Sequence, residues 1–210
     1  MDGQGRQQAV EQTEISTAKA MAFGLAIQGV VLAVAVVCLY LSAVDVAWPA
    51  RGGVLGPFVL GVTGALVTYL VCALLTRSNT VAGARLRDHC EALQVMFGRF
   101  SWGQIGLLAL AAGVCEELLF RGFLQPWLTS LSSPLVGILV ASVIFGLLHY
   151  ASFFYFFITF VIGVILGVVY WASESLLLVV VWHAVYDLIA MGVLAKFPGY
   201  LKLNVAHPSP

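Results

Sequence analysis

The sequence predicts an all-α, polytopic membrane protein with about six transmembrane helices and one interfacial amphipathic helix. Hydrophobic residues occupy 61% of the 210 positions and charged residues only 10%, against roughly 45–50% and about 25% in soluble domains. The hydrophobic residues are gathered into long uninterrupted runs. Helices are expected because strands in lipid would have to close into a barrel with alternating polarity.

Six apolar stretches are each close to the roughly 20 residues that a spanning helix needs. They form a transmembrane domain over residues 20–196, between a polar N-terminal tail, 1–19, and a polar C-terminal tail, 197–210, which is expected to be disordered. The first stretch lacks a small-residue cleavage pattern, which favours a retained span over a removed signal peptide. The stretches cover residues 20–43, 54–76, 102–126, 134–151, 153–172 and 175–196.

The segment RSNTVAGARLRDHCEALQVMFGRF, between the second and third stretches, mixes four arginines with apolar side chains. This composition is typical of a helix lying on the membrane surface. A solvated linker is the alternative. His89 in this segment and His207 in the C-terminal tail are interpreted as solvated surface residues.

The distribution of basic residues predicts the orientation, because cytoplasmic loops are enriched in lysine and arginine. With both termini in the cytoplasm, only Arg51 lies outside. The formal net charge is zero, so nothing suggests a nucleic-acid partner. The apolar stretches and this orientation together predict a multi-pass protein of the plasma membrane. The basic residues on the inner side would be Arg6, Lys19, Arg77, Arg85, Arg87, Arg99, Lys196 and Lys202.

Gly163 and Gly167 form a GxxxG pattern in FVIGVILGVVY, a spacing that lets two helices approach closely. The preferred interpretation is packing within the protein. Homodimerisation is the alternative, and the oligomeric state stays open.

Ionisable side chains within the apolar stretches are the strongest functional signal. A charged residue at the bilayer centre costs about 2.5–3.5 kcal/mol on an insertion scale, so such residues are expected to have a function. They are Glu116, Glu117, Arg121, His149, His183 and Asp187.

Helical geometry separates the two glutamates. Glu117 and Arg121 are four residues apart, roughly 40° around the helix, and can form an ion pair. Glu116 lies roughly 140° from Arg121 and presents its carboxylate to another face. Glu117 and Arg121 are therefore interpreted as a structural pair, and Glu116 as the group available for chemistry.

Two further pairs share the four-residue spacing, Phe145 with His149 and His183 with Asp187. Two imidazoles and an acid can bind a divalent metal, or the histidines can polarise a water directly, with Glu116 as general base. A proton- or ion-coupled transporter also uses such residues, although no inverted repeat is visible. A catalytically idle membrane scaffold is a third possibility.

Three segments carry a family resemblance. GVCEELLFRGFLQ, VIFGLLHY and VVVWHAVYDL resemble, in order, the EExxxR, FxxxH and HxxxN/D motifs of the CPBP intramembrane proteases. This family, also called Abi, includes the type II CAAX prenyl endopeptidases and bacteriocin-processing or self-immunity proteins. The resemblance covers about residues 100–190.

The resemblance implies an intramembrane endopeptidase that hydrolyses a peptide bond of a membrane-associated protein or peptide. According to the resemblance, Glu116 is the water-activating base, and His149 and His183 are the water- or metal-binding imidazoles. Asp187 takes the place where many relatives have Asn. The remaining motif positions are filled by Glu117, Arg121 and Phe145.

The metal is left open at this point. The family is described as metalloproteases, which implies a divalent metal, with zinc as the expected ion. His149, His183 and Asp187 would be its ligands, with Glu116 as a further candidate. Direct activation of water by glutamate and histidine is the alternative for this family.

Helix rise gives an expected depth for the site. Glu116 falls about 21 Å from an inner start at Trp102, and His183 about 12 Å from an outer start at Ser175. In a core about 30 Å thick these depths nearly agree, in the outer half. His149 is too deep when counted from Pro134, so the fourth stretch is expected to enter the bilayer near Leu139.

Overall fold

A computed structural model describes residues 3–42, 44–46, 48 and 53–204, with side chains from Thr17 onward. Within these residues every regular element is a helix, which confirms the predicted fold class. The elements are α1 (Gly3–Leu41), α2 (Leu55–Arg77), α3 (Val81–Phe97), α4 (Trp102–Glu117), the π-helix η1 (Leu118–Leu124), α5 (Gln125–Leu131), α6 (Pro134–Leu148), α7 (Phe153–Ser173), α8 (Leu176–Lys196) and the 3-10 helix η2 (Pro198–Leu201).

Four helical segments in the described part of the chain are long and apolar enough to cross a membrane: Thr17–Leu41, Leu55–Arg77, Phe153–Ser173 and Leu176–Lys196. The expected third span is a run of α4, η1 and α5 that continues without a break from Trp102 to Leu131. The expected fourth span is α6, whose 15 residues reach about 22 Å, less than the roughly 30 Å hydrocarbon core.

The fourth span is shorter than the apolar run because the chain leaves the helix at His149. The backbone of His149 has left helical geometry, and the Ser152 side chain accepts a hydrogen bond from the Tyr155 backbone N–H to begin α7. Hydropathy alone extends the run through Ala151, because it does not register a serine cap.

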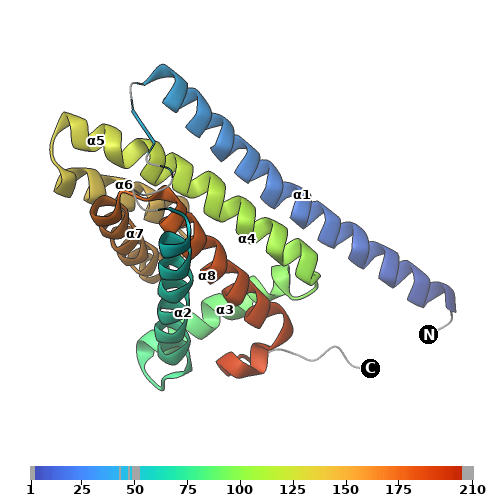
Figure 1. Ribbon diagram of the computed structural model, residues 1–210. Coiled ribbons are helices and arrows are strands. Elements are labelled where there is room, and N and C mark those ends of the chain that lie inside the picture. The colour runs from blue at the N-terminus through green and yellow to red at the C-terminus, as the bar shows by residue number, and fades with distance from the viewer. Residues whose placement is uncertain (1–2, 43, 47, 49–52, 205–210) are drawn as a thin grey trace.

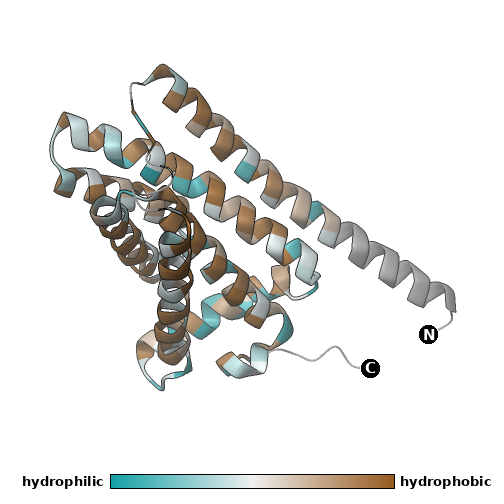
Figure 2. Ribbon diagram, viewed as in Figure 1, coloured by the Kyte–Doolittle hydropathy of each residue, from teal (hydrophilic) through white to brown (hydrophobic). Residues whose placement is uncertain are grey.

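Helix α8 lies at the centre of the bundle, packed against α2 and α4, while α6 packs against α7 and α1 lies along α4 (Figure 1). Apolar residues cover the spanning helices, and polar residues gather on α3 and its connections (Figure 2). A Cβ on Gly113 of α4 would lie 2.7 Å from the Ala184 Cβ and 2.8 Å from the Ala184 backbone nitrogen of α8. The backbones of α4 and α8 therefore pass in direct contact at the turn before Glu116.

The GxxxG pattern packs inside the protein. A Cβ on Gly163 would lie 3.2 Å from the Ser142 Cβ on α6, and one on Gly167 would lie 2.9 Å from the Gln125 Oε1 on α5. The small residues thus bring α7 close to α5 and α6. This agrees with the interpretation that the GxxxG pattern serves packing within the protein.

The C-terminal end of α2, helix α3 and the C-terminal segment lie together at one end of the bundle (Figure 1). This end is here called the basic end, because basic side chains from all three segments form hydrogen bonds there. Arg87 donates from one nitrogen to the Thr76 and Ser78 carbonyl oxygens at 2.6 and 2.8 Å. Arg77 donates to the Tyr200 carbonyl oxygen, and Lys202 donates to the Arg77 carbonyl oxygen at 2.9 Å. The helix predicted between the second and third spans is present as α3.

The expected disorder of the C-terminal tail is wrong for its first residues. Pro198–Leu201 forms η2, and Leu201 and Leu203 are buried against Ala73 and Leu194. Burial of these two leucine side chains stabilises the segment against the bundle, although its sequence shows no periodic pattern of apolar residues. The backbone of α1 is helical from Gly3, so the polar N-terminal residues extend the first helix. Arg51 and His207 lie outside the described residues.

Candidate active site

Glu116, His149, His183 and Asp187 come from three helical segments and meet within the bundle. The Glu116 Oε2 lies 3.5 Å from the His149 Nε2 and 4.0 Å from the His183 Nε2. The His183 Nε2 lies 3.5 Å from the Asp187 Oδ2. Glu116 is on the last turn of α4, His149 follows the end of α6, and His183 and Asp187 are one turn apart on α8.

The hydrogen bonds of the two histidines define their neutral tautomers. The His149 Nδ1 is 2.9 Å from the Phe145 carbonyl oxygen, and the His183 Nδ1 is 2.8 Å from the Glu117 Oε1. Both partners accept, so each Nδ1 is assigned the proton. In the neutral rings, each Nε2 then carries a lone pair, and the two nitrogens lie 3.5 and 4.0 Å from the Glu116 Oε2.

Glu117 forms the expected ion pair and a further contact with α8. Its Oε1 accepts from the Arg121 guanidinium at 2.7 Å and from the His183 Nδ1 at 2.8 Å. Its side chain is fully buried, and Arg121 is 1% exposed. The contact with His183 joins residues 66 apart in sequence, which helical spacing does not predict. Glu117 therefore both neutralises Arg121 and orients the His183 ring.

The π-helix η1 places Arg121 and Gln125 against α7. The Gln125 backbone N–H bonds to the Phe120 carbonyl oxygen, five residues earlier. The Arg121 guanidinium donates to the Gly163 carbonyl oxygen, and the Gln125 amide to the Gly167 carbonyl oxygen, each at 2.9 Å. Such wide turns are frequent at functional sites. The sequence analysis did not select Gln125. Its position as a polar amide within an apolar stretch could have indicated it.

Phe145 is the aromatic centre of the site. Its ring centroid lies 4.4 Å from that of His149 and 6.1 Å from that of His183. The Arg121 guanidinium carbon lies 5.0 Å from the same ring centroid, within the range of a cation–π contact. Phe145 thus holds both imidazoles and shields the Glu117–Arg121 pair.

Gln28 of α1 also belongs to the site, although sequence reasoning did not select it. Its Nε2 donates to the Glu116 Oε1 at 2.7 Å. Within the described residues, the Glu116 Oε2, Glu117 Oε2 and Gln28 Oε1 are buried without a hydrogen-bond partner. The Glu116 carboxylate is therefore bonded on one oxygen and open on the other.

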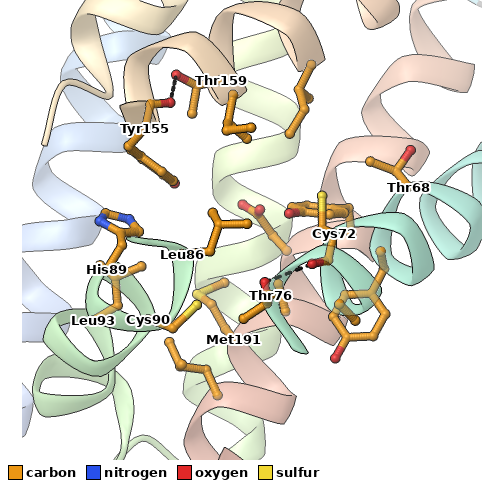
Figure 3. A pocket seen from close by; sticks show the side chains of 18 of the residues that line it. Thr68, Cys72, Thr76, Leu86, His89, Cys90, Leu93, Tyr155, Thr159 and Met191 are labelled. Atoms are coloured by element: carbon orange, nitrogen blue, oxygen red, sulfur yellow. Dashed lines mark hydrogen bonds between the residues drawn. The ribbon is translucent and has the colours of Figure 1, made fainter. Parts of the chain in front are cut away.

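A cavity of about 350 Å³ adjoins these residues. His149, His183 and Asp187 lie on its wall, and it extends toward Leu86 and His89 of α3. Figure 3 shows α2 and α3 on facing sides of it, with Met191 of α8 between them. Most of its lining is aliphatic or aromatic. The site is thus joined to an apolar cavity that reaches toward the basic end.

The donor atoms agree in kind with a zinc site but are not arranged as a closed one. Imidazole nitrogens and carboxylates are zinc ligands, and neighbouring ligands on tetrahedral zinc are about 3.4 Å apart. The two 3.5 Å separations match this spacing, while the 4.0 Å separation exceeds it. Among the described residues, no group of three or more metal-ligating side chains is spaced to hold an ion.

The fold and the site define an integral membrane protein in which acid and imidazole groups gather, with Glu116 and His183 buried and His149 and Asp187 partly exposed. Residues 98–189 match the family described as "Type II CAAX prenyl endopeptidase Rce1-like", which confirms the resemblance seen in the motifs. Every candidate residue from Glu116 to Asp187 lies within this match, whereas Gln28 lies outside it. Comparisons with curated proteins and with solved structures found no match.

Proposed function

We propose that the protein is an intramembrane endopeptidase that hydrolyses a peptide bond of a membrane-associated protein or peptide. One observation carries the proposal. The Glu116 Oε2 makes no hydrogen bond within the described residues, and it faces the Nε2 atoms of His149 and His183. This is an arrangement that binds a water molecule and removes its proton. The family match supports an endopeptidase-type function in general.

The proposed reaction uses Glu116 as general base. A water donates one proton toward the Glu116 Oε2 and the other toward the Nε2 lone pair of one histidine. Glu116 takes its proton as the water oxygen bonds to the scissile carbonyl carbon. The carbon–nitrogen bond then breaks as that proton passes to the leaving amine, which gives a carboxylic acid and an amine. Glu117 holds His183 in place through the hydrogen bond from the His183 Nδ1.

The same side chains offer a second form of the proposal, in which the histidine lone pairs bind a divalent metal, with zinc as the expected ion, instead of accepting hydrogen bonds from the water. His149, His183 and Asp187 would hold it, with Glu116 as a further ligand candidate, and the ion would activate water and polarise the substrate carbonyl. The Nδ1 hydrogen bond of each histidine, to the Phe145 carbonyl oxygen and to the Glu117 Oε1, is the kind of support that metal-binding imidazoles have.

Metal content and activity test this part of the proposal. Purified protein should contain zinc, and a strong chelator should remove both the zinc and the activity. His183→Ala should lower the zinc content. Full activity of metal-free protein would support direct activation of water by Glu116 and the histidines.

The proposed location is the plasma membrane, with both termini in the cytoplasm. The gathering of Arg77, Arg87 and Lys202 at one end of the bundle supports this orientation. Because the cavity extends toward the same end, we propose that substrates reach the site from the cytoplasmic side.

Newly formed peptide termini test the activity and identify substrates in one experiment. Membranes from cells carrying the wild type, Glu116→Ala or His149→Ala are compared by terminal-peptide mass spectrometry. Peptide termini present only with the wild type are expected. If the three samples gave the same termini, the proposal would be withdrawn. Proton-dependent uptake in proteoliposomes, abolished by Asp187→Asn without proteolysis, would instead identify a transporter.

A further inference from the structure

Gln28 is the only amide or charged side chain between Ala20 and Leu41 of α1. It is 9% exposed and faces the bundle. A buried polar side chain is costly unless it forms hydrogen bonds, and a single amide in an apolar helix therefore indicates a defined partner.

That partner is the carboxylate of the proposed base. The Gln28 Nε2 donates to the Glu116 Oε1 at 2.7 Å, a contact between residues 88 apart in sequence. The reversed amide would place its oxygen against the carboxylate oxygen, so the contact also fixes which amide atom faces Glu116. With the Oε1 held, the carboxylate plane is set and the Oε2 remains directed at the Nε2 atoms of His149 and His183.

The packing of α1 on α4 holds Gln28 in this position. Met21 is buried in a cluster with Ile105 and Leu108 of α4. A Cβ on Gly24 would lie 3.1 Å from the Leu108 Cδ1. Met21, Gly24 and Gln28 follow at spacings of three and four residues and therefore lie on one face of α1.

We infer that Gln28 is a positioning residue for the reaction, one that fixes the Glu116 carboxylate through its Oε1 and keeps the Oε2 turned toward the histidines. The inference rests on the proposed function. It assigns a role to α1, which lies outside residues 98–189, the segment that matches the family. Neither Gln28 nor Glu116 is part of the cavity lining, which His149, His183 and Asp187 share. Gln28 acts through Glu116 because its amide is hydrogen-bonded to the Glu116 Oε1.

The test replaces Gln28 by methionine, which has a similar length and no amide donor. With a substrate identified from the peptide termini, kcat of Gln28→Met is expected to fall about 10–100-fold, the usual effect of losing the hydrogen-bonding support of an active-site ligand. KM should not change, because the cavity wall is intact. Leu203→Ala, a change at a buried position outside the α1–α4 packing and outside the cavity lining, should lower Tm and leave kcat unchanged.

A purely structural role for Gln28 predicts a different result. Gln28→Met would then behave like Leu203→Ala, with a lower Tm and wild-type kcat, and this outcome would overturn the inference. Should Gln28→Met fail to fold, Gln28→Asn decides, because it keeps the amide but draws it back by one carbon. A reduced kcat in folded Gln28→Asn supports the inference, and a wild-type kcat overturns it.

The same assay separates the inference from the proposed function. If Glu116→Ala abolishes cleavage while Gln28→Met retains full kcat, only the inference fails. If wild-type protein shows no cleavage that depends on Glu116, the proposed function fails and the inference falls with it.

Discussion

Glu116 and Glu117 are adjacent in sequence but have different surroundings. Glu117 is fully buried and shares one oxygen between Arg121 and the His183 ring. Glu116 is bonded by Gln28 on one oxygen and has no partner on the other within the described residues. Helical spacing predicts that the two carboxylates face different ways. It cannot predict Gln28 or the His183 contact, since both depend on helices far apart in the chain.

The buried position of Glu117 leads to a stability prediction. Glu117→Gln should lower the free energy of unfolding by about 3–5 kcal/mol, because Arg121 would remain buried without a counter-charge. Denaturant unfolding in detergent measures this. Asp88→Asn on the exposed face of α3 is the control and should change stability by less than about 0.5 kcal/mol. Equal stability of the two variants would show that the pair is not needed for folding.

At the scale of the element, Gly113 sets the distance between α4 and α8. A Cβ at this position would be 2.8 Å from the Ala184 backbone nitrogen, so the helices must separate to accept one. Because Glu116 follows one turn later and faces His183, a shift of α4 would also widen the site.

Gly113→Ala should therefore reduce the free energy of unfolding by about 1–3 kcal/mol and reduce cleavage as well. Gly106→Ala is the matched control on the same helix, since a Cβ there meets no atom within 4 Å, and it should be neutral or slightly stabilising. Thermal unfolding and cleavage rates are measured for both. Wild-type behaviour of Gly113→Ala would contradict the close packing of α4 on α8.

The packing of α3 on α7 is expected to depend on pH. His89 of α3 stacks on Tyr155 of α7 with ring centroids 3.7 Å apart, so the interpretation of His89 as a solvated surface residue is wrong. Burial lowers the pKa of His89 from its ordinary value of 6.5. The folded state therefore disfavours the protonated ring. As the pH falls below about 6.5 the unfolded state binds more protons, so this contact loses stability in acid.

Hydrogen exchange across residues 81–97 checks this prediction. Protection should fall between pH 7.5 and pH 5.5 after correction for intrinsic exchange. His89→Phe, which keeps a ring without the proton, should remove the change. If wild-type protection were the same at both pH values, His89 would not control the α3 contact.

The sequence predicted some helices correctly and misplaced the boundaries of others. Long apolar runs identified α1, α2, α7 and α8, because their length and hydropathy together leave few alternatives. The end of α6 was placed too late, since a helix end at His149 and a Ser152 cap depend on local hydrogen bonds. The C-terminal segment appeared disordered because Leu201 and Leu203 form no periodic pattern, although each is buried.

At the scale of the whole molecule, the composition was enough to predict a helical membrane protein, and three short motifs were enough to predict which side chains meet. What could not be predicted was the cavity, whose walls come mainly from α2, α3, α7 and α8, with Phe145 and His149 at the end of α6. Its extension toward the basic end suggests cytoplasmic access, even though helix rise places Glu116 and His183 in the outer half. The depth in the bilayer stays a prediction.

Labelling of single cysteines tests the orientation. In a background without the native cysteines, Asp88→Cys on α3 should react with a membrane-impermeant maleimide only after the cells are opened. Ser132→Cys, between α5 and α6, should react on intact cells. The reverse pattern would place the basic end, and with it the cavity, on the outer side.

The rate of substrate cleavage by purified Glu116→Gln protein in liposomes tests the central claim most directly. Glutamine keeps the shape of the side chain but cannot take a proton from water. With the fold intact, the rate should fall about 10²–10⁴-fold relative to the wild type. Cleavage by Glu116→Gln at the wild-type rate would show that this carboxylate does not activate the water, and would contradict the account.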